Sequence, residues 1–134
     1  MNPIVTRLYW QLMALLLACR LVGWRPALAM ALALGVVQAL HFAWARRGWR
    51  ARDVQVRLVF LALLACGLPA AMAWLYALQL GGVLLLLVAD YCVLARLLDL
   101  APWNRDQPLS AALIRQALLT PPAQRGLRVT PSAR

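Results

Sequence analysis

Long hydrophobic runs, separated by short polar stretches, dominate the chain up to about residue 100. A helix needs about 20 apolar residues to cross roughly 30 Å of hydrocarbon at about 1.5 Å per residue. Residues 4–23 and 27–45 each provide such a run. Trp24, Arg25 and Pro26 predict a short turn between them, because tryptophan suits the membrane interface and proline fits the first turn of a helix.

The next apolar stretch, residues 58–98, is about twice the length that one span requires. Its only formal charges are Asp90 and Arg96, so two helices must share it. We favour the glycine pair 81–82, after Gln79, as the reversal, and Pro69 is then a kink within the third span. The segment 67–69 is the competing position for the reversal. We therefore predict an all-α, integral membrane four-helix bundle over residues 1–100, with spans at 4–23, 27–45, 58–79 and 82–100.

Composition strengthens the membrane interpretation. The chain of 134 residues is 64% hydrophobic, with a mean hydropathy of +0.72, which is more apolar surface than a soluble domain of this size can bury. The net charge of +10 would suggest nucleic acid on a soluble fold. Here the arginines flank apolar runs, where they set orientation and contact anionic lipid head groups. We expect the bilayer as a partner and no nucleic acid.

The arginines also predict the orientation of the chain. Five arginines lie within residues 46–57 and six between Arg96 and the end, whereas the turn at Arg25 has at most two and the third connection has none. The positive-inside rule then places the middle loop and the C-terminal segment in the cytoplasm. An even number of spans places the N-terminus there too, as a multi-pass protein of the bacterial inner membrane.

Residues 101–134 are expected to form a cytoplasmic interfacial segment followed by a basic tail. Leu109, Leu113, Ile114 and Leu118 fall on one side of a short helix that Asp106 could cap, so the helix would lie on the membrane or on a partner. Residues 120–134, with three prolines and three arginines, are predicted to be mobile unless another subunit holds them. Expected partner or lipid contacts are Trp103, Arg105, Arg46, Arg47 and Arg50.

A cluster of polar residues within the spans is the candidate site. Inserting an aspartate at the centre of a membrane helix costs about 2.5–3.5 kcal/mol on insertion scales. We therefore expect Asp90 to have a polar partner or a functional role. By their distance from flanking arginines, Gln11, Gln38 and His41 lie in the same cytoplasmic half as Asp90. We favour a structural hydrogen-bond network. The alternatives are a proton-linked or quinone site with His41 as donor, or haem ligation by His41, which would need a second axial ligand from elsewhere.

No catalytic motif supports an enzyme. The sequence lacks G-x-S-x-G, H-E-x-x-H and a glycine-rich phosphate loop, and its three cysteines have no C-x-x-C spacing, so neither a metal nor another cofactor is expected. We therefore expect a non-catalytic accessory or assembly subunit of a larger inner-membrane complex, such as a respiratory or electron-transport enzyme, with other membrane subunits as partners. The alternatives are a small oligomeric proton-linked transporter and a quinone- or redox-binding membrane component.

Overall fold

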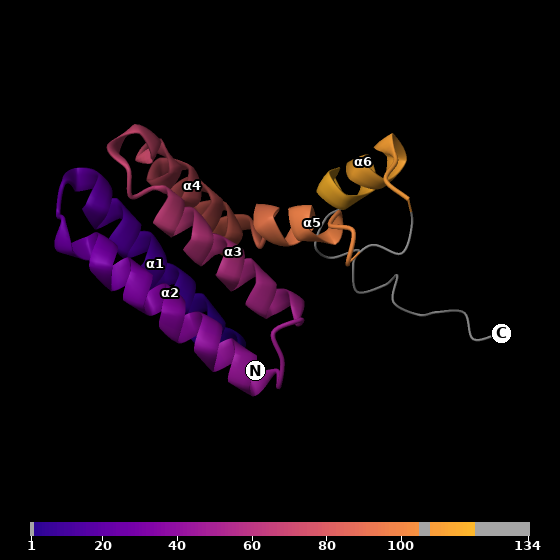
Figure 1. Cartoon of the computed structure of the whole chain (residues 1–134), viewed down its shortest axis with the longest axis horizontal. Coiled ribbons are helices and arrows are strands. Elements are labelled where there is room, and N and C mark those ends of the chain that lie inside the picture. Colours follow the sequence, from indigo (N-terminus) through magenta and orange to yellow (C-terminus); the bar gives the residue numbers. More distant parts are fainter. Residues whose placement is uncertain (1, 105–107, 120–134) are drawn as a thin grey trace.

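The computed structural model describes residues 2–104 and 108–119, and these residues form helices and no strands (Figure 1). A bundle is formed by α1 (Pro3–Val22), α2 (Pro26–Ala45), α3 (Arg52–Cys66) and α4 (Trp74–Ala89), with a 3-10 turn, η1 (Ala70–Met72), before α4. Two shorter helices, α5 (Val93–Asp99) and α6 (Ala111–Leu119), follow outside the bundle (Figure 1). The all-α class is confirmed.

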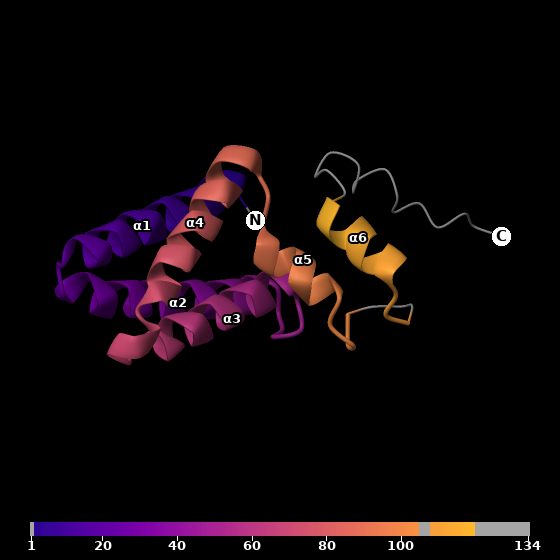
Figure 2. The ribbon, with the colours of Figure 1, turned by 90° about the horizontal axis from the view of Figure 1, so that it is seen from above.

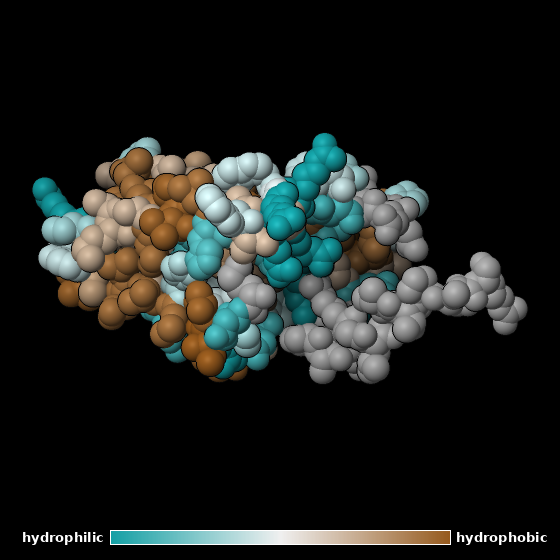
Figure 3. Space-filling model, turned by 90° about the horizontal axis from the view of Figure 1, so that it is seen from below, coloured by the Kyte–Doolittle hydropathy of each residue, from teal (hydrophilic) through white to brown (hydrophobic). Residues whose placement is uncertain are grey.

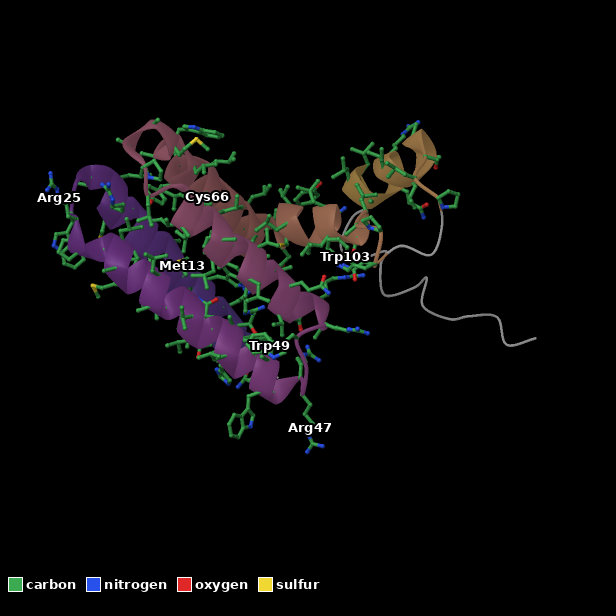
Figure 4. The ribbon with its side chains drawn as sticks, in the orientation of Figure 1. Met13, Arg25, Arg47, Trp49, Cys66 and Trp103 are labelled. Atoms are coloured by element: carbon green, nitrogen blue, oxygen red, sulfur yellow. The ribbon has the colours of Figure 1, made fainter. Side chains whose placement is uncertain are left out.

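The bundle helices alternate in direction. α1 packs against α2 and α4, and α2 also packs against α3. Figure 2 shows α4 crossing from the end of α3 toward the start of α1. One end of the bundle, which we call the arginine end, therefore holds the start of α1, the α2–α3 connection and the end of α4. The other, the turn end, holds the α1–α2 and α3–α4 connections, and Figure 4 shows Arg25 and Arg47 at these opposite ends of α2.

Among the described residues, three segments are long and apolar enough to cross a membrane: Pro3–Val22, Pro26–Ala45 and Ala70–Ala89. The first two agree with the predicted spans at 4–23 and 27–45. The prediction of four such helices is wrong, because α3 has 15 residues, about 22 Å, and begins with charged side chains. Three apolar helices fit a membrane protein, which is the class that the sequence predicted.

The predicted reversal at residues 79–82 is also wrong. The chain turns between Gly67 and Ala73, and α4 continues through the glycine pair 81–82. Pro69 lies in this turn and does not kink a helix, because proline lacks an amide donor and disfavours helical backbone at the preceding residue. Two glycines inside a helix cost only about 1 kcal/mol each relative to alanine. The surrounding leucines favour the helix and offset this cost.

The predicted fourth span, residues 82–100, is divided. α4 ends at Ala89, and Asp90 adopts a left-handed conformation with φ of 51°. The Cys92 sulfur then accepts a hydrogen bond from the Ala95 amide and caps a separate helix, α5. The expected amphipathic helix is α6, capped by Ser110, whose hydroxyl accepts from the Leu113 amide at 3.2 Å. The proposed cap Asp106, Arg105 and the predicted mobile tail at 120–134 lie outside the described residues.

Small residues let α2 approach its neighbours closely. Every fourth residue of one face is small and buried, namely Ala27, Ala31, Gly35, Ala39 and Ala43. Such spacing brings helix backbones together and is common between membrane helices. Larger side chains, including Met13, Leu17, Phe60, Leu64 and Tyr76, fill the space among α1, α3 and α4 (Figure 4 labels Met13).

The outer surface of the bundle is largely hydrophobic. Only 22–39% of the residues in the three long apolar windows are buried within the protein. Figure 3 shows hydrophobic residues spread over the bundle and hydrophilic ones gathered around the α2–α3 connection. Apolar faces of this extent require an apolar solvent, as a bilayer provides. Exposed examples are Leu8, Leu12, Leu15, Met30, Val37, Leu40, Leu78, Leu84 and Val88.

Candidate functional site: a charged cleft at the arginine end

A cleft of about 420 Å³ opens at the arginine end, where all four bundle helices and the start of α5 meet. Charged and aromatic side chains dominate its walls. They include Arg7 and Trp10 from α1, Phe42 from α2, Arg46 after α2, Asp53 and Arg57 from α3, and Asp90 and Cys92 from the α4–α5 connection.

Asp90 lies at the mouth of this cleft and pairs with Arg7. The two side chains are 58% and 67% exposed, for Arg7 and Asp90 respectively, and the Arg7 Nη2–Asp90 Oδ1 distance is 2.9 Å. The partners expected for Asp90 were Gln11, Gln38 or His41, and the structure provides Arg7 instead. Because α4 ends one residue earlier, Asp90 lies at the end of a span and is not buried within one. Exposed pairs of this kind contribute about 0–1 kcal/mol.

Tyr9 joins Gln38 and His41. Its hydroxyl shares a hydrogen bond of 2.7 Å with His41 Nδ1, and its carbonyl accepts from Gln38 Nε2 at 3.4 Å. Gln38 is buried, whereas Gln11 is exposed on the outer face of α1. The structure therefore brings two of the four predicted residues together, gives Asp90 a separate partner, and leaves Gln11 facing outward.

Arg57 is one of two buried arginines, with Arg96, that the sequence analysis used only for orientation. It is 5% exposed, and its guanidinium carbon lies 3.3 Å from the centroid of the Phe42 ring and 5.5 Å from that of Trp10. Nη1 donates to the Asp53 carbonyl at 2.6 Å. Nε and Nη2 are buried without a hydrogen-bond partner among the described residues. Helical spacing is the signal that was missed, because Arg57 precedes buried Phe60 by three positions on one face.

Three of the arginines that were predicted as partner or lipid contacts lie near the same end. Arg46 pairs with Asp53, which bridges the end of α2 and the start of α3. Arg47, with φ of 51°, and Arg50 are exposed in the α2–α3 connection. Their exposure leaves both free to contact lipid or protein, as the sequence analysis proposed.

Polar contacts tie α5 and the residues after it to the start of α3. Arg52 pairs with Asp99 at 2.8 Å. The Gln55 side-chain oxygen accepts from Asn104 at 2.8 Å and from the Trp103 indole at 3.3 Å. Trp103 remains 71% exposed, and Figure 4 shows it beside the end of α5. These contacts hold the C-terminal end of α5 to the bundle.

Two side chains hold α6 in turn: Tyr91, which precedes α5, and Arg96, which lies within α5. Arg96, 2% exposed, donates through Nη1 to the carbonyls of Ala117 at 2.9 Å and Leu118 at 3.2 Å. The Tyr91 hydroxyl also donates to the Leu118 carbonyl, and the Arg96 guanidinium lies 4.1 Å from the Tyr91 ring centroid. These bonds satisfy carbonyls that the end of a helix leaves without partners. We call α5 and α6 together the α5–α6 arm.

The chemistry of the cleft is that of a positively charged receptor. Arginine stays protonated in proteins, so Arg57 cannot serve as a general base but can donate hydrogen bonds to an anion. Arg7 and Arg46 are each paired with a carboxylate, which leaves Arg57 as the uncompensated charge among the lining residues. No protein-family model, curated protein or solved structure matches this chain.

Proposed function

We propose that this protein is a non-catalytic accessory or assembly subunit of a larger complex in the bacterial inner membrane, such as a respiratory or electron-transport enzyme. The observation that carries the proposal is the α5–α6 arm. Its α5 packs against α3 and contributes Leu98 to the core, whereas its α6 packs mainly against α5 and projects from the bundle (Figures 1 and 2). An ordered projection of this kind serves naturally as a docking element.

The surface of the arm supports a docking role. Leu113, Ile114 and Leu118 are half-buried, which accounts for part of the amphipathic face of α6 by packing within the chain. Leu97 and Leu119 are nevertheless 50% and 69% exposed on the arm. Exposed leucines of this kind match the apolar centre of protein interfaces.

The arginine distribution supports the orientation. The start of α1, the α2–α3 connection, the first half of α3 and α5 carry seven of the ten described arginines and lie at the arginine end, whereas the turn end has Arg20 and Arg25. The positive-inside rule places the arginine end, and with it the α5–α6 arm, in the cytoplasm. A partner would then meet the arm at the cytoplasmic face of the membrane.

Truncation of the arm tests the proposal. A tagged chain ending after Asn104 keeps the contacts to Gln55 but removes α6. The full chain, purified from its native membrane in mild detergent, should copurify with a stoichiometric set of membrane subunits, and the truncated chain should lose them while still inserting. As a matched control, Leu12→Ala alters an exposed leucine of α1, far along the chain from the arm, and should retain the partners. Full recovery of every partner by the truncated chain would show that α6 is not needed for docking.

A further inference from the structure

A second cavity, an apolar groove of about 530 Å³, lies between α3, α4 and α5. Both this groove and the charged cleft fall within the range of about 300–1,000 Å³ that is typical of small-molecule sites. The two cavities share Trp10, Leu86 and Cys92 as wall residues, so they are neighbours. One ligand could therefore place a charged part in the cleft and an apolar part in the groove.

The groove is open because α4 carries glycines where it borders the cavity. Gly82 follows Gln79 by three residues and precedes Leu86 by four, so all three lie on one face of α4, and all three line the groove. A Cβ atom at Gly81 or Gly82 would meet no atom within 4 Å. The pair therefore makes no close helix contact that would explain it, and its lack of side chains leaves space in the groove.

One polar atom inside the groove also lacks a partner. Gln79 is 5% exposed, and its Nε2 donates to the Phe60 carbonyl at 3.0 Å. Its Oε1 is buried without a hydrogen-bond partner among the described residues. The remaining wall is almost wholly hydrophobic, including Leu63, Leu75 and Leu97. The hydrophobic wall favours a long apolar chain as the occupant, although such a chain offers no donor to Gln79 Oε1.

The cleft supplies the complementary charge. Phe42, Trp10 and the backbone of α3 lie against Arg57, and Arg57 lines the cleft, so the cleft is the side from which an acceptor can approach its buried Nε and Nη2. Among the lining residues, three arginines stand against two aspartates, and both aspartates already pair with Arg7 and Arg46. Phosphate oxygens accept strong, charge-assisted hydrogen bonds from a guanidinium.

We propose that the cleft and the groove together form a binding site for one anionic phospholipid. Its phosphate lies at Arg57 in the cleft, and one acyl chain lies in the groove against Gly82. The surrounding surface favours a membrane lipid over a soluble phosphate compound, because Leu78 and Leu85, exposed on α4, border the groove where lipid would enter. Leu97 of α5 lines the groove and also belongs to the α5–α6 arm, and lipid binding does not require that the arm dock to a partner.

The test measures lipid preference on the purified full-length protein in a neutral detergent. Native mass spectrometry counts bound phosphatidylglycerol and phosphatidylcholine of identical chains, and thermal unfolding measures the stabilisation that each provides. One phosphatidylglycerol should be retained at least about tenfold more strongly than phosphatidylcholine, and Arg57→Gln should abolish that preference. Arg25→Gln, which removes an exposed arginine at the turn end that lines neither cavity, should keep it.

A groove variant tests the acyl chain separately. Gly82→Leu places a side chain in the groove without a clash at Cβ and improves helix propensity, so the protein should fold and lose the bound lipid. Retention of phosphatidylglycerol by Gly82→Leu would overturn the proposal, as would an equal preference in Arg57→Gln and the unaltered protein. Should Arg57→Gln fail to fold, Gly82→Leu alone decides. Inorganic phosphate should give no thermal stabilisation, and a full shift with phosphate alone would indicate a free-anion site and refute the lipid assignment.

Discussion

Replacing Arg96 by methionine should release α6 from the rest of the molecule. α6 has nine residues, and isolated helices shorter than about 12–15 residues are marginal in water. Its order therefore depends on its attachment to α5, where Arg96 donates to two carbonyls of its last turn. The positive guanidinium also faces the negative end of the α6 dipole, which adds to the attraction.

The loss can be estimated from the contacts. A hydrogen bond from a charged group contributes about 1.5–3 kcal/mol, and a cation–π contact such as that between Arg96 and Tyr91 about 0.5–1 kcal/mol. Together they give about 2–4 kcal/mol, which corresponds to roughly 30- to 1,000-fold in the equilibrium between attached and released α6. Methionine keeps most of the side-chain volume, so the change isolates these polar contacts. Tyr91→Phe removes one neutral hydrogen bond and should shift the equilibrium by about 2- to 10-fold.

Amide hydrogen exchange of the protein in detergent measures this equilibrium directly. Protection of residues 111–119 should fall in Arg96→Met, while that of α1, α2 and α4 stays as in the unaltered protein. Arg115→Met, at an exposed position of α6 itself, is the matched control and should leave exchange unchanged. If exchange of α6 in Arg96→Met rises less than about threefold, Arg96 does not hold the helix and the estimate from its contacts is wrong.

Two further changes test the packing and the ion pair. Gly67→Ala should destabilise the bundle by about 1–3 kcal/mol in detergent unfolding, because its Cβ would lie 2.6 Å from the Tyr76 ring. Gly35→Ala would meet only a leucine methyl at 3.0 Å and should stay within about 1 kcal/mol, so equal losses would contradict the packing. Asp90→Asn should change stability by less than about 1 kcal/mol, because its bond to Arg7 is exposed. If the chain supports proton-linked transport or redox activity, loss of that activity in a correctly inserted Asp90→Asn protein would contradict a purely structural role.

The first helical hairpin could be predicted because its boundaries are marked locally. The Asn2 side chain accepts from the Ile4 amide at 2.9 Å, and Pro3 begins α1. Gly23 ends it with φ of 111°, a conformation that glycine adopts readily. Pro26 then begins α2. Each boundary therefore depends on residues within one turn of it, which sequence analysis can recognise.

The second hairpin lacks such local boundary signals, and hydropathy alone does not locate its turn. Residues 58–89 are apolar nearly throughout, so two reversals were compatible with the length of the stretch. Pro69 is a strict constraint on backbone geometry, whereas the glycine pair 81–82 is only a weak one, and the stricter constraint prevails. The expected depth of Asp90 was measured from Arg96 along one continuous helix, and the break after Ala89 removes that premise. Side-chain partners such as Arg7 depend on this tertiary arrangement.

The short apolar segment of α3 explains why a charged site exists at the arginine end. Arg7 of α1 meets Asp90 after α4, and Arg20 lies 5.7 Å from the Tyr76 ring centroid, so α1 and α4 are antiparallel. α3 must therefore carry the chain from the arginine end back to the turn end.

Residues 58–66 are its only continuous apolar part, and they extend about 14 Å. Arg57 consequently lies level with the rings of Trp10 and Phe42, within the apolar helices. A charge facing lipid at such a position is costly, so the side chain turns inward and stacks on those rings. The same inward placement leaves two guanidinium nitrogens of Arg57 without acceptors next to the cleft. The charged site is therefore a consequence of the short apolar segment of α3 among its longer neighbours.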